Sequence, residues 1–150
     1  MIQKLWILEK LYGNVIIPEA VLYELEKLKL NKLNISQITD STWIKIQPVM
    51  NESLVAILSE SLDRGESEAI VLAQELRADL LIIDEIKGRN YAKKLNIRII
   101  GLVGILVQAK IEGILENVGE ILDELKHKAG FWISQELYDK AIVMSNEKLL

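Results

Sequence analysis

Acidic side chains are the residues best suited to chemistry in this sequence, and they gather at both ends of one segment, residues 62–85. The two groups are Asp63, Glu66 and Glu68 at one end and Asp84 and Glu85 at the other. The first group opens a stretch with helical apolar spacing, and the second follows an apolar run, residues 80–83, that predicts a strand. If that strand is parallel to its neighbours, its acidic end lies where open α/β sheets place their sites.

Carboxylates that converge from separate elements repel one another unless a cation, a shared proton or a basic partner relieves the repulsion. Ligand sets made only of oxygen suit Mg²⁺ or Mn²⁺, and such an ion can activate water and neutralise a phosphodiester. The structural alternative is that these acids are helix caps and solvated charges. Periodicity separates two of them, because Glu66 begins a core-facing stripe while Glu68 is turned by about 200° from it. We therefore predict that Glu66 is the inner carboxylate.

Short apolar segments alternate with amphipathic ones along the chain, which predicts an α/β fold with a parallel sheet covered on both faces. The predicted strands are residues 15–17, 43–47, 80–83 and 97–101. The predicted helices are residues 5–12, 19–28, 52–61, 66–76, 87–95, 102–113 and 118–129, with a last helix capped by Ser134. Residues 31–42 are polar and predict a loop. In the second helix, Val21, Leu25 and Leu28 are expected to face the core.

Composition limits the class of protein. The chain has 150 residues, half of them apolar, which predicts a single domain over residues 1–150. No apolar run approaches the roughly 20 residues of a membrane span, and no secretory signal is evident, so a cytoplasmic location is expected. The absence of cysteine excludes a disulfide framework and a thiolate nucleophile. The net charge of −4 argues against a generally basic nucleic-acid binder, so contact with nucleic acid needs a local patch.

Four segments together resemble the PIN-domain-like family of nucleic-acid-binding proteins, close to the toxin members of toxin–antitoxin pairs. The segments are VIIPEAVLYEL, DRGESEAIVLAQEL, ADLLIIDE and IRIIGLVGILVQAKIEGIL, and the resemblance covers nearly the whole chain. It implies a PIN-like three-layer fold, in which helices flank a central, mostly parallel sheet. It also implies a ribonuclease that holds magnesium or manganese through three or four acidic residues and is inhibited by a small antitoxin protein.

The same resemblance assigns the site. The matching catalytic and metal-binding residues are Glu24, Glu66 and Asp84, with Glu68 and Glu85 as further candidates. The basic residues that follow the acidic strand end, chiefly Lys87, Arg89 and Lys93, are candidates for holding RNA phosphates. For any one of these basic residues, a solvated helix face is an equally good interpretation.

The remaining residues that could do chemistry are interpreted structurally. His127, the only histidine, is predicted to be a surface residue at a helix end rather than a base. The aromatic residues Trp6, Trp43, Trp132, Tyr23 and Tyr138 are expected to be core anchors rather than platforms for bases. The glycines at 101 and 104 lack the third glycine and the downstream acid of a dinucleotide fingerprint, so no nucleotide cofactor is expected.

The sequence departs from the family at its beginning. The family starts with a strand that ends in a first metal-binding Asp, and neither is present before the predicted helix at residues 5–12. We therefore expect either that the native chain is longer or that this is a short form that completes its sheet differently. Unpaired strand edges would favour self-association into a homo-oligomer. A compact monomer in light scattering across a wide concentration range would contradict that expectation.

Two alternatives to the nuclease stay open. One is a catalytically inactive PIN-like module that binds nucleic acid or a protein, because the first Asp is absent. The other is a metal-dependent phosphate-transfer enzyme that uses Asp84 on a small phosphorylated substrate. Loss of RNA cleavage in Glu66→Gln or Asp84→Asn would distinguish the nuclease from both.

Overall fold

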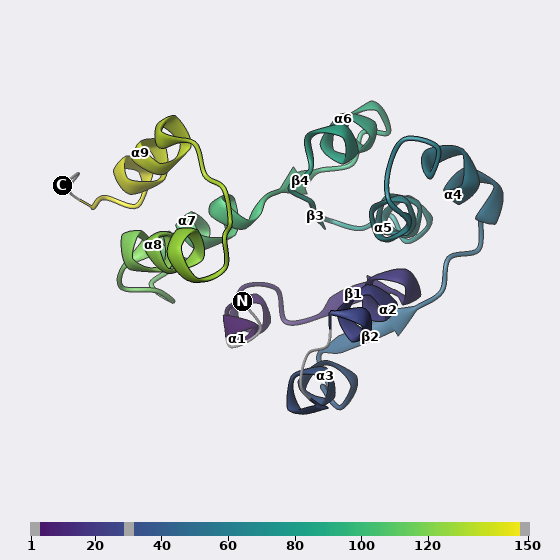
Figure 1. Ribbon diagram of the computed structural model, residues 1–150, viewed down its shortest axis with the longest axis horizontal. Helices are drawn as coiled ribbons and strands as arrows, with labels where there is room; N and C mark the ends of the chain where they lie inside the picture. The colour runs from purple at the N-terminus through teal and green to yellow at the C-terminus, as the bar shows by residue number, and fades with distance from the viewer. Residues whose placement is uncertain (1–3, 29–31, 148–150) are drawn as a thin grey trace. The chain divides into compact units, whose positions relative to one another are not determined.

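The computed structural model describes residues 4–28 and 32–147 (Figure 1). The helices in this part of the chain are α1 (Trp6–Tyr12), α2 (Glu19–Lys27), α3 (Lys32–Thr39), α4 (Glu52–Leu58), α5 (Arg64–Glu75), α6 (Ile86–Lys94), α7 (Leu102–Ile111), α8 (Val118–Lys128) and α9 (Gln135–Met144). The strands are β1 (Val15–Pro18), β2 (Ile44–Gln47), β3 (Leu81–Ile82) and β4 (Ile99–Ile100). The order of these elements agrees with the sequence prediction, apart from α3.

The chain divides into two compact units, residues 12–100 and residues 1–11 with 101–150. In the second unit α7, α8 and α9 pack against one another. Their core side chains include Ala109, Val118 and Leu122, which are fully buried. This unit is helical in the described residues because its apolar positions recur at three and four residues, with Ser134 capping α9 as predicted.

Parallel strand pairs lie in the unit of residues 12–100. β1 pairs with β2, with Val15 opposite Ile44, and β3 pairs with β4, with Leu81 opposite Ile99. Each pair is joined through helices, as parallel strands require. The α/β class with parallel strands is therefore confirmed. Among the described residues the strands form two two-stranded sheets, so each strand has one hydrogen-bonded neighbour (Figure 1).

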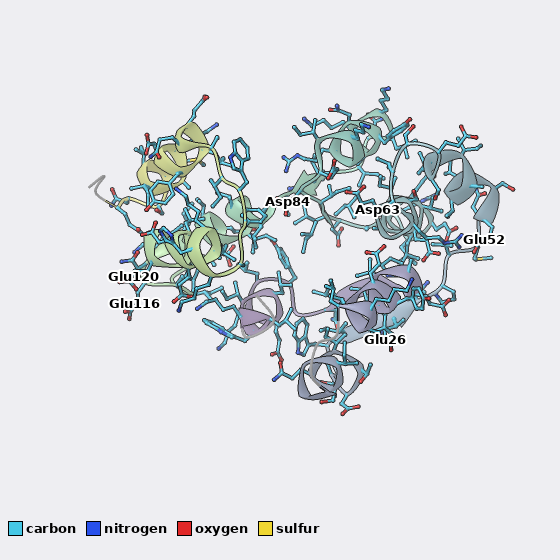
Figure 2. All side chains as sticks on the ribbon, in the orientation of Figure 1. Glu26, Glu52, Asp63, Asp84, Glu116 and Glu120 are labelled. Carbon is cyan, nitrogen blue, oxygen red and sulfur yellow. The ribbon has the colours of Figure 1, made fainter. Side chains whose placement is uncertain are left out.

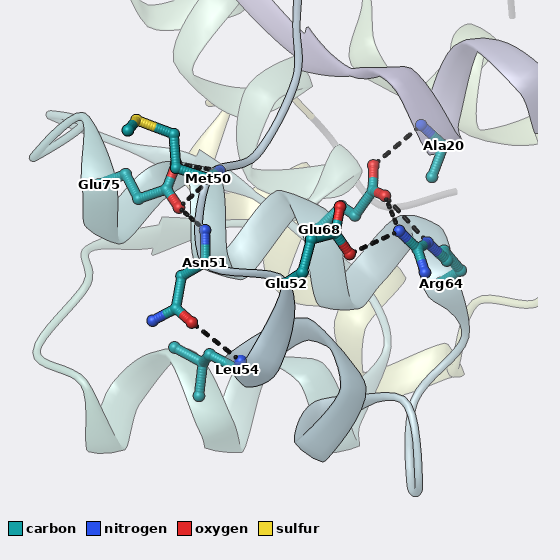
Figure 3. A network of polar contacts seen from close by, with 8 residues as sticks. All are labelled: Ala20, Met50, Asn51, Glu52, Leu54, Arg64, Glu68 and Glu75. Atoms are coloured by element: carbon teal, nitrogen blue, oxygen red, sulfur yellow. Dashed lines mark hydrogen bonds and ion pairs between the residues drawn. The ribbon is translucent and has the colours of Figure 1, made fainter.

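Helix α5 is the centre of this unit. It packs against α2, α4, α6, β1 and β3. Its side chains Ser67, Ile70 and Val71 are completely buried, and full burial of an aliphatic side chain contributes about 1.5–3 kcal/mol. Acidic residues of α5 also bind neighbouring segments. The carboxylate of Glu75 accepts hydrogen bonds from the backbone N–H groups of Met50 and Asn51, which precede α4 (Figure 3). Helix α5 thus fixes the elements that surround the acidic residues.

Three structural predictions were wrong. Residues 31–42 were expected to form a loop, but α3 begins at Lys32, because Ile35 and the buried Ile38 provide helical apolar spacing; residue 31 lies outside the described residues. Leu28 is 68% exposed rather than part of the core, because α2 ends at Lys27. The aromatic residues Trp6, Tyr23 and Trp132 are exposed and do not anchor the core. In the described ranges, no helix is both long enough and apolar enough to span a membrane.

Candidate functional site

The start of α5 is fixed by a capping box between Asp63 and Glu66. A carboxylate oxygen of Asp63 accepts the backbone N–H of Glu66 at 2.8 Å, and the carboxyl group of Glu66 is hydrogen-bonded to the backbone of Asp63. This reciprocal arrangement satisfies two N–H groups that the helix itself cannot pair. The hydroxyl of Ser67 adds a hydrogen bond to the carbonyl of Asp63 at 2.8 Å. Both carboxylates are therefore held in place at the helix start.

Glu24 reaches the same helix start from α2. Its Oε1 accepts the backbone N–H of Gly65 at 3.0 Å. An anionic side chain is stabilised there by the unpaired N–H groups and by the dipole of the helix. The carboxylate of Glu24 consequently lies beside the capping box, although 41 residues separate Glu24 from Gly65 along the chain.

Glu68 lies in a different environment from Glu66. It is 5% exposed, whereas Glu66 is half-buried, so the prediction that Glu66 is the more buried of the two was wrong. One oxygen of Glu68 accepts the backbone N–H of Ala20 at 3.0 Å, and the other lies 2.8 Å from the guanidinium of Arg64 (Figure 3). These partners compensate for the buried charge, which periodicity alone could not reveal.

The acidic residues of α2, α5 and the end of β3 line one pocket, with a volume of about 340 Å³. The carboxylates along it are Glu24, Asp63, Glu66, Asp84 and Glu85. Asp84 and Glu85 follow β3, and Figure 2 labels Asp84 there and Asp63 at the start of α5. The structure thus brings Glu24, Glu66 and Asp84 to one cavity. Glu68 does not line this pocket.

Repulsion among the carboxylates is visible at Glu66. Burial raises the pKa of Glu66, and the negative charges of Asp63, Glu85 and Glu24 raise that pKa further. The hydrogen bond with the backbone of Asp63 opposes this shift. A site of this kind gains stability from a bound cation or from a shared proton.

The side chains of the pocket are suitable in type for a divalent metal ion. Carboxylate oxygens are the ligands that Mg²⁺ and Mn²⁺ prefer. Within the described part of the chain, however, no three Asp, Glu, His or Cys side chains stand close enough together to hold a metal ion. The donor set fits the ion in chemical type, but in the described residues the carboxylates do not converge on one point as metal ligands do.

The predicted basic residues differ in exposure. Lys87 and Lys93 are exposed on α6, which begins directly after the acidic residues. Arg89 is half-buried and donates a hydrogen bond from Nη1 to the carbonyl oxygen of Ile83 at 3.2 Å, so it also fastens α6 to the end of β3. His127 is exposed in the last turn of α8, as predicted.

A family model described as a PIN domain matches residues 1–147 of this chain. The chain belongs to the PIN-domain family. PIN domains are nuclease-like modules that generally depend on divalent metal ions, so the acidic pocket lies in a protein of a suitable class. No curated protein and no solved structure matches the chain.

Sequence reasoning placed Asp63 in the acidic group of this PIN domain without giving it a role in the site, and it gave no role to Gly65. Asp63 lines the cavity, and the spacing Asp63-x-x-Glu66 of a capping box was the signal that could have fixed its position. Gly65 also lines the cavity, in close contact with Glu24. No local pattern indicates that contact, because Glu24 comes from a different helix.

Proposed function

We propose that this chain is a divalent-metal-dependent ribonuclease of the PIN type, acting as a single domain. Its catalytic and metal-binding residues would be Glu24, Glu66 and Asp84, with Glu85 as a further ligand candidate. The observation that carries the proposal is that three elements of a PIN domain bring these acids to one pocket. The raised pKa of Glu66 supports it, since uncompensated carboxylates attract a cation.

In this proposal the carboxylates of the pocket bind the metal ion, and nearby lysines bind the RNA. A bound Mg²⁺ or Mn²⁺ would neutralise charge on the phosphodiester and make water a better nucleophile. Asp84 would contribute a carboxylate from the end of β3, while Glu24 and Glu66 are held at the start of α5. Lys87 and Lys93 would hold neighbouring RNA phosphates.

The partners follow from the same family assignment. We propose that the substrate is RNA, and that the protein is the cytoplasmic toxin of a pair whose antitoxin is a small protein. A homo-oligomer is also proposed, because each described strand has a single neighbour and Ile16 and Ile82 are about 40% exposed. Light scattering over a wide concentration range tests this association.

The test of the main proposal is isothermal titration of Mn²⁺ and Mg²⁺ into the chain and into Asp84→Asn. We expect binding by the native chain and a loss of about 10-fold or more in affinity in the variant, a scale typical of disturbed metal sites. Asp79→Asn is the matched control, because Asp79 is exposed and precedes the same strand that Asp84 follows. RNA cleavage should fall in Asp84→Asn alone. Absence of binding to either ion would contradict the proposal.

A catalytically inactive PIN-like module that binds RNA or a protein is the second candidate. It is favoured by the structural use of Glu24, whose Oε1 is already bonded to the N–H of Gly65. This candidate predicts RNA binding without cleavage, unchanged by Mn²⁺ and by Asp84→Asn. Filter binding beside the cleavage assay separates the two functions.

A further inference from the structure

We propose that Gly65 is a positioning residue for Glu24: the space left by its missing side chain holds the Glu24 carboxylate at the pocket. The role of that carboxylate in metal binding rests on the proposed function. The positioning itself does not, because it concerns contacts within the metal-free chain.

The contact between the two residues leaves no room for a side chain at position 65. A Cβ atom built on Gly65 would lie 2.5 Å from Oε1, 2.7 Å from Oε2 and 2.8 Å from Cδ of Glu24. Real Cβ atoms essentially never approach other atoms within 3.0 Å. Every other residue at this position therefore forces the carboxylate to move.

The backbone gives no other reason for a glycine here. Gly65 is the second residue of α5 and has helical conformation, which every L-residue adopts readily. Alanine is the better helix former, and glycine is unfavourable in a helix. The close approach of Glu24 is thus the feature that requires glycine.

A side chain at position 65 should move the carboxylate rather than the helices. One turn further along α5, Glu68 accepts the N–H of Ala20 at 3.0 Å, and Ala20 lies one turn before Glu24 in α2. Arg64 binds both Glu68 and Glu52, which holds the Glu68 carboxylate in place and joins α5 to α4 (Figure 3). The carboxylate of Glu24 is the far end of a flexible side chain, so it is the part that can shift at little cost.

The first experiment is Mn²⁺ titration of Gly65→Ala and Glu24→Gln, singly and together. We expect each single variant to lose about 10-fold in Mn²⁺ affinity. The double variant should bind as weakly as Glu24→Gln alone, because Gly65→Ala acts through Glu24. The midpoint of thermal unfolding of Gly65→Ala should stay within about 3 °C of the native value. Independent, additive losses or unchanged affinity in Gly65→Ala would overturn the proposal.

The matched control is Gly119→Ala, at the equivalent position of α8. Gly119 also donates its N–H to a distant carboxylate, that of Glu147, but a Cβ there would lie 3.2 Å from the nearest oxygen. Its substitution should leave Mn²⁺ affinity unchanged. An equal loss in this control would mean that glycine replacement weakens binding through general loss of structure, which also overturns the proposal.

A metal-free measurement decides the positioning even if the native chain binds no metal. In NMR spectra recorded in EDTA, Glu24→Gln should shift the amide resonance of Gly65, because it replaces the acceptor of that N–H. In the Gly65→Ala background the same substitution should leave the amide of residue 65 nearly unchanged, because the carboxylate has already moved. Equal shifts in both backgrounds would overturn the positioning role. A native chain without Mn²⁺ binding would overturn the proposed function alone.

Discussion

Two helix starts in this protein, those of α5 and α8, share a local arrangement and differ in their surroundings. The matching residues are Asp63, Gly65 and Glu66 at the start of α5 and Asn117, Gly119 and Glu120 at the start of α8. In both helices the first side chain accepts the N–H of the glutamate three residues later. In both, the glycine donates its N–H to a glutamate from elsewhere in the chain.

At α8 the distant carboxylate is fully used and balanced. Glu147 accepts the N–H of Val118 at 2.6 Å and that of Gly119 at 3.0 Å. The ammonium of Lys110 lies 3.9 Å from the same carboxylate. The helix start is therefore closed by structural contacts that leave its anionic partner compensated.

At α5 the distant carboxylate is one of several. Glu24 accepts one N–H, and its pocket contains four more carboxylates. Burial raises the pKa of Glu66, and the neighbouring negative charges raise that pKa further. The same capping pattern thus has one compensated carboxylate as its partner at α8 and a group of neighbouring carboxylates at α5.

The largest expected effect tests whether only the α5 start is functional. Under the proposed function, Glu66→Gln should lower RNA cleavage by about 100-fold, because it removes a carboxylate that contributes to the reacting site. Glu120→Gln changes the matching position of α8 and should leave cleavage unchanged. A gel assay with labelled single-stranded RNA and Mn²⁺ measures both variants. Equal losses of cleavage in Glu66→Gln and Glu120→Gln would contradict the proposed difference between the two helix starts.

A smaller effect on stability should appear at α8. Glu147→Gln removes the negative charge from an acceptor of two N–H groups and from the ion pair with Lys110. Weakening such charged hydrogen bonds should lower the free energy of unfolding by about 1–3 kcal/mol in urea titrations. Glu24→Gln should cost less, because relief of repulsion offsets the weakened bond to Gly65. Glu116→Gln, at an exposed residue, is the control, and a larger loss in Glu24→Gln than in Glu147→Gln would contradict the comparison.

The smallest expected effect is a pH dependence of the metal-free chain. Because the pKa of Glu66 is raised in the folded state, its stabilising contribution is complete below the ordinary value of 4.5 and is lost as the pH rises through the raised value. Relative to Glu66→Gln, the native chain should therefore lose stability from about pH 4 toward neutrality. Solvent screening keeps the effect small. Thermal melts in EDTA measure it, and a difference that grows in the opposite direction would contradict it.

Local signals in the sequence were sufficient for most of the fold. Apolar spacing and caps gave the helices and the short strands, including the cap at Ser134. The acidic end of β3 at Asp84 also followed from local pattern. For residues 31–42 the prediction of a loop was wrong, because it followed the polar composition of the segment rather than the helical spacing of Ile35 and Ile38.

The arrangement of the site was only partly predictable. Family resemblance selected Glu24, Glu66 and Asp84, and these residues do line one pocket; their catalytic roles stay predictions. The burial of Glu68 was missed, because it depends on Arg64 and on a backbone N–H of α2, a pairing across 48 residues. Contacts between distant segments leave no periodic signal in a single sequence.

Helices α2 and α5 are joined by two reciprocal hydrogen bonds. Glu24 of α2 accepts an N–H from the first turn of α5, and Glu68 of α5 accepts an N–H from the first turn of α2. If either first turn frays, the donor in that turn separates from its acceptor, and one of the two bonds between the helices is lost. The two helix starts are therefore coupled, because local opening of either one removes a bond that joins the two helices. Because Glu24 and Gly65 line the pocket, local opening at the start of α5 also loosens the wall of the pocket that these two residues form.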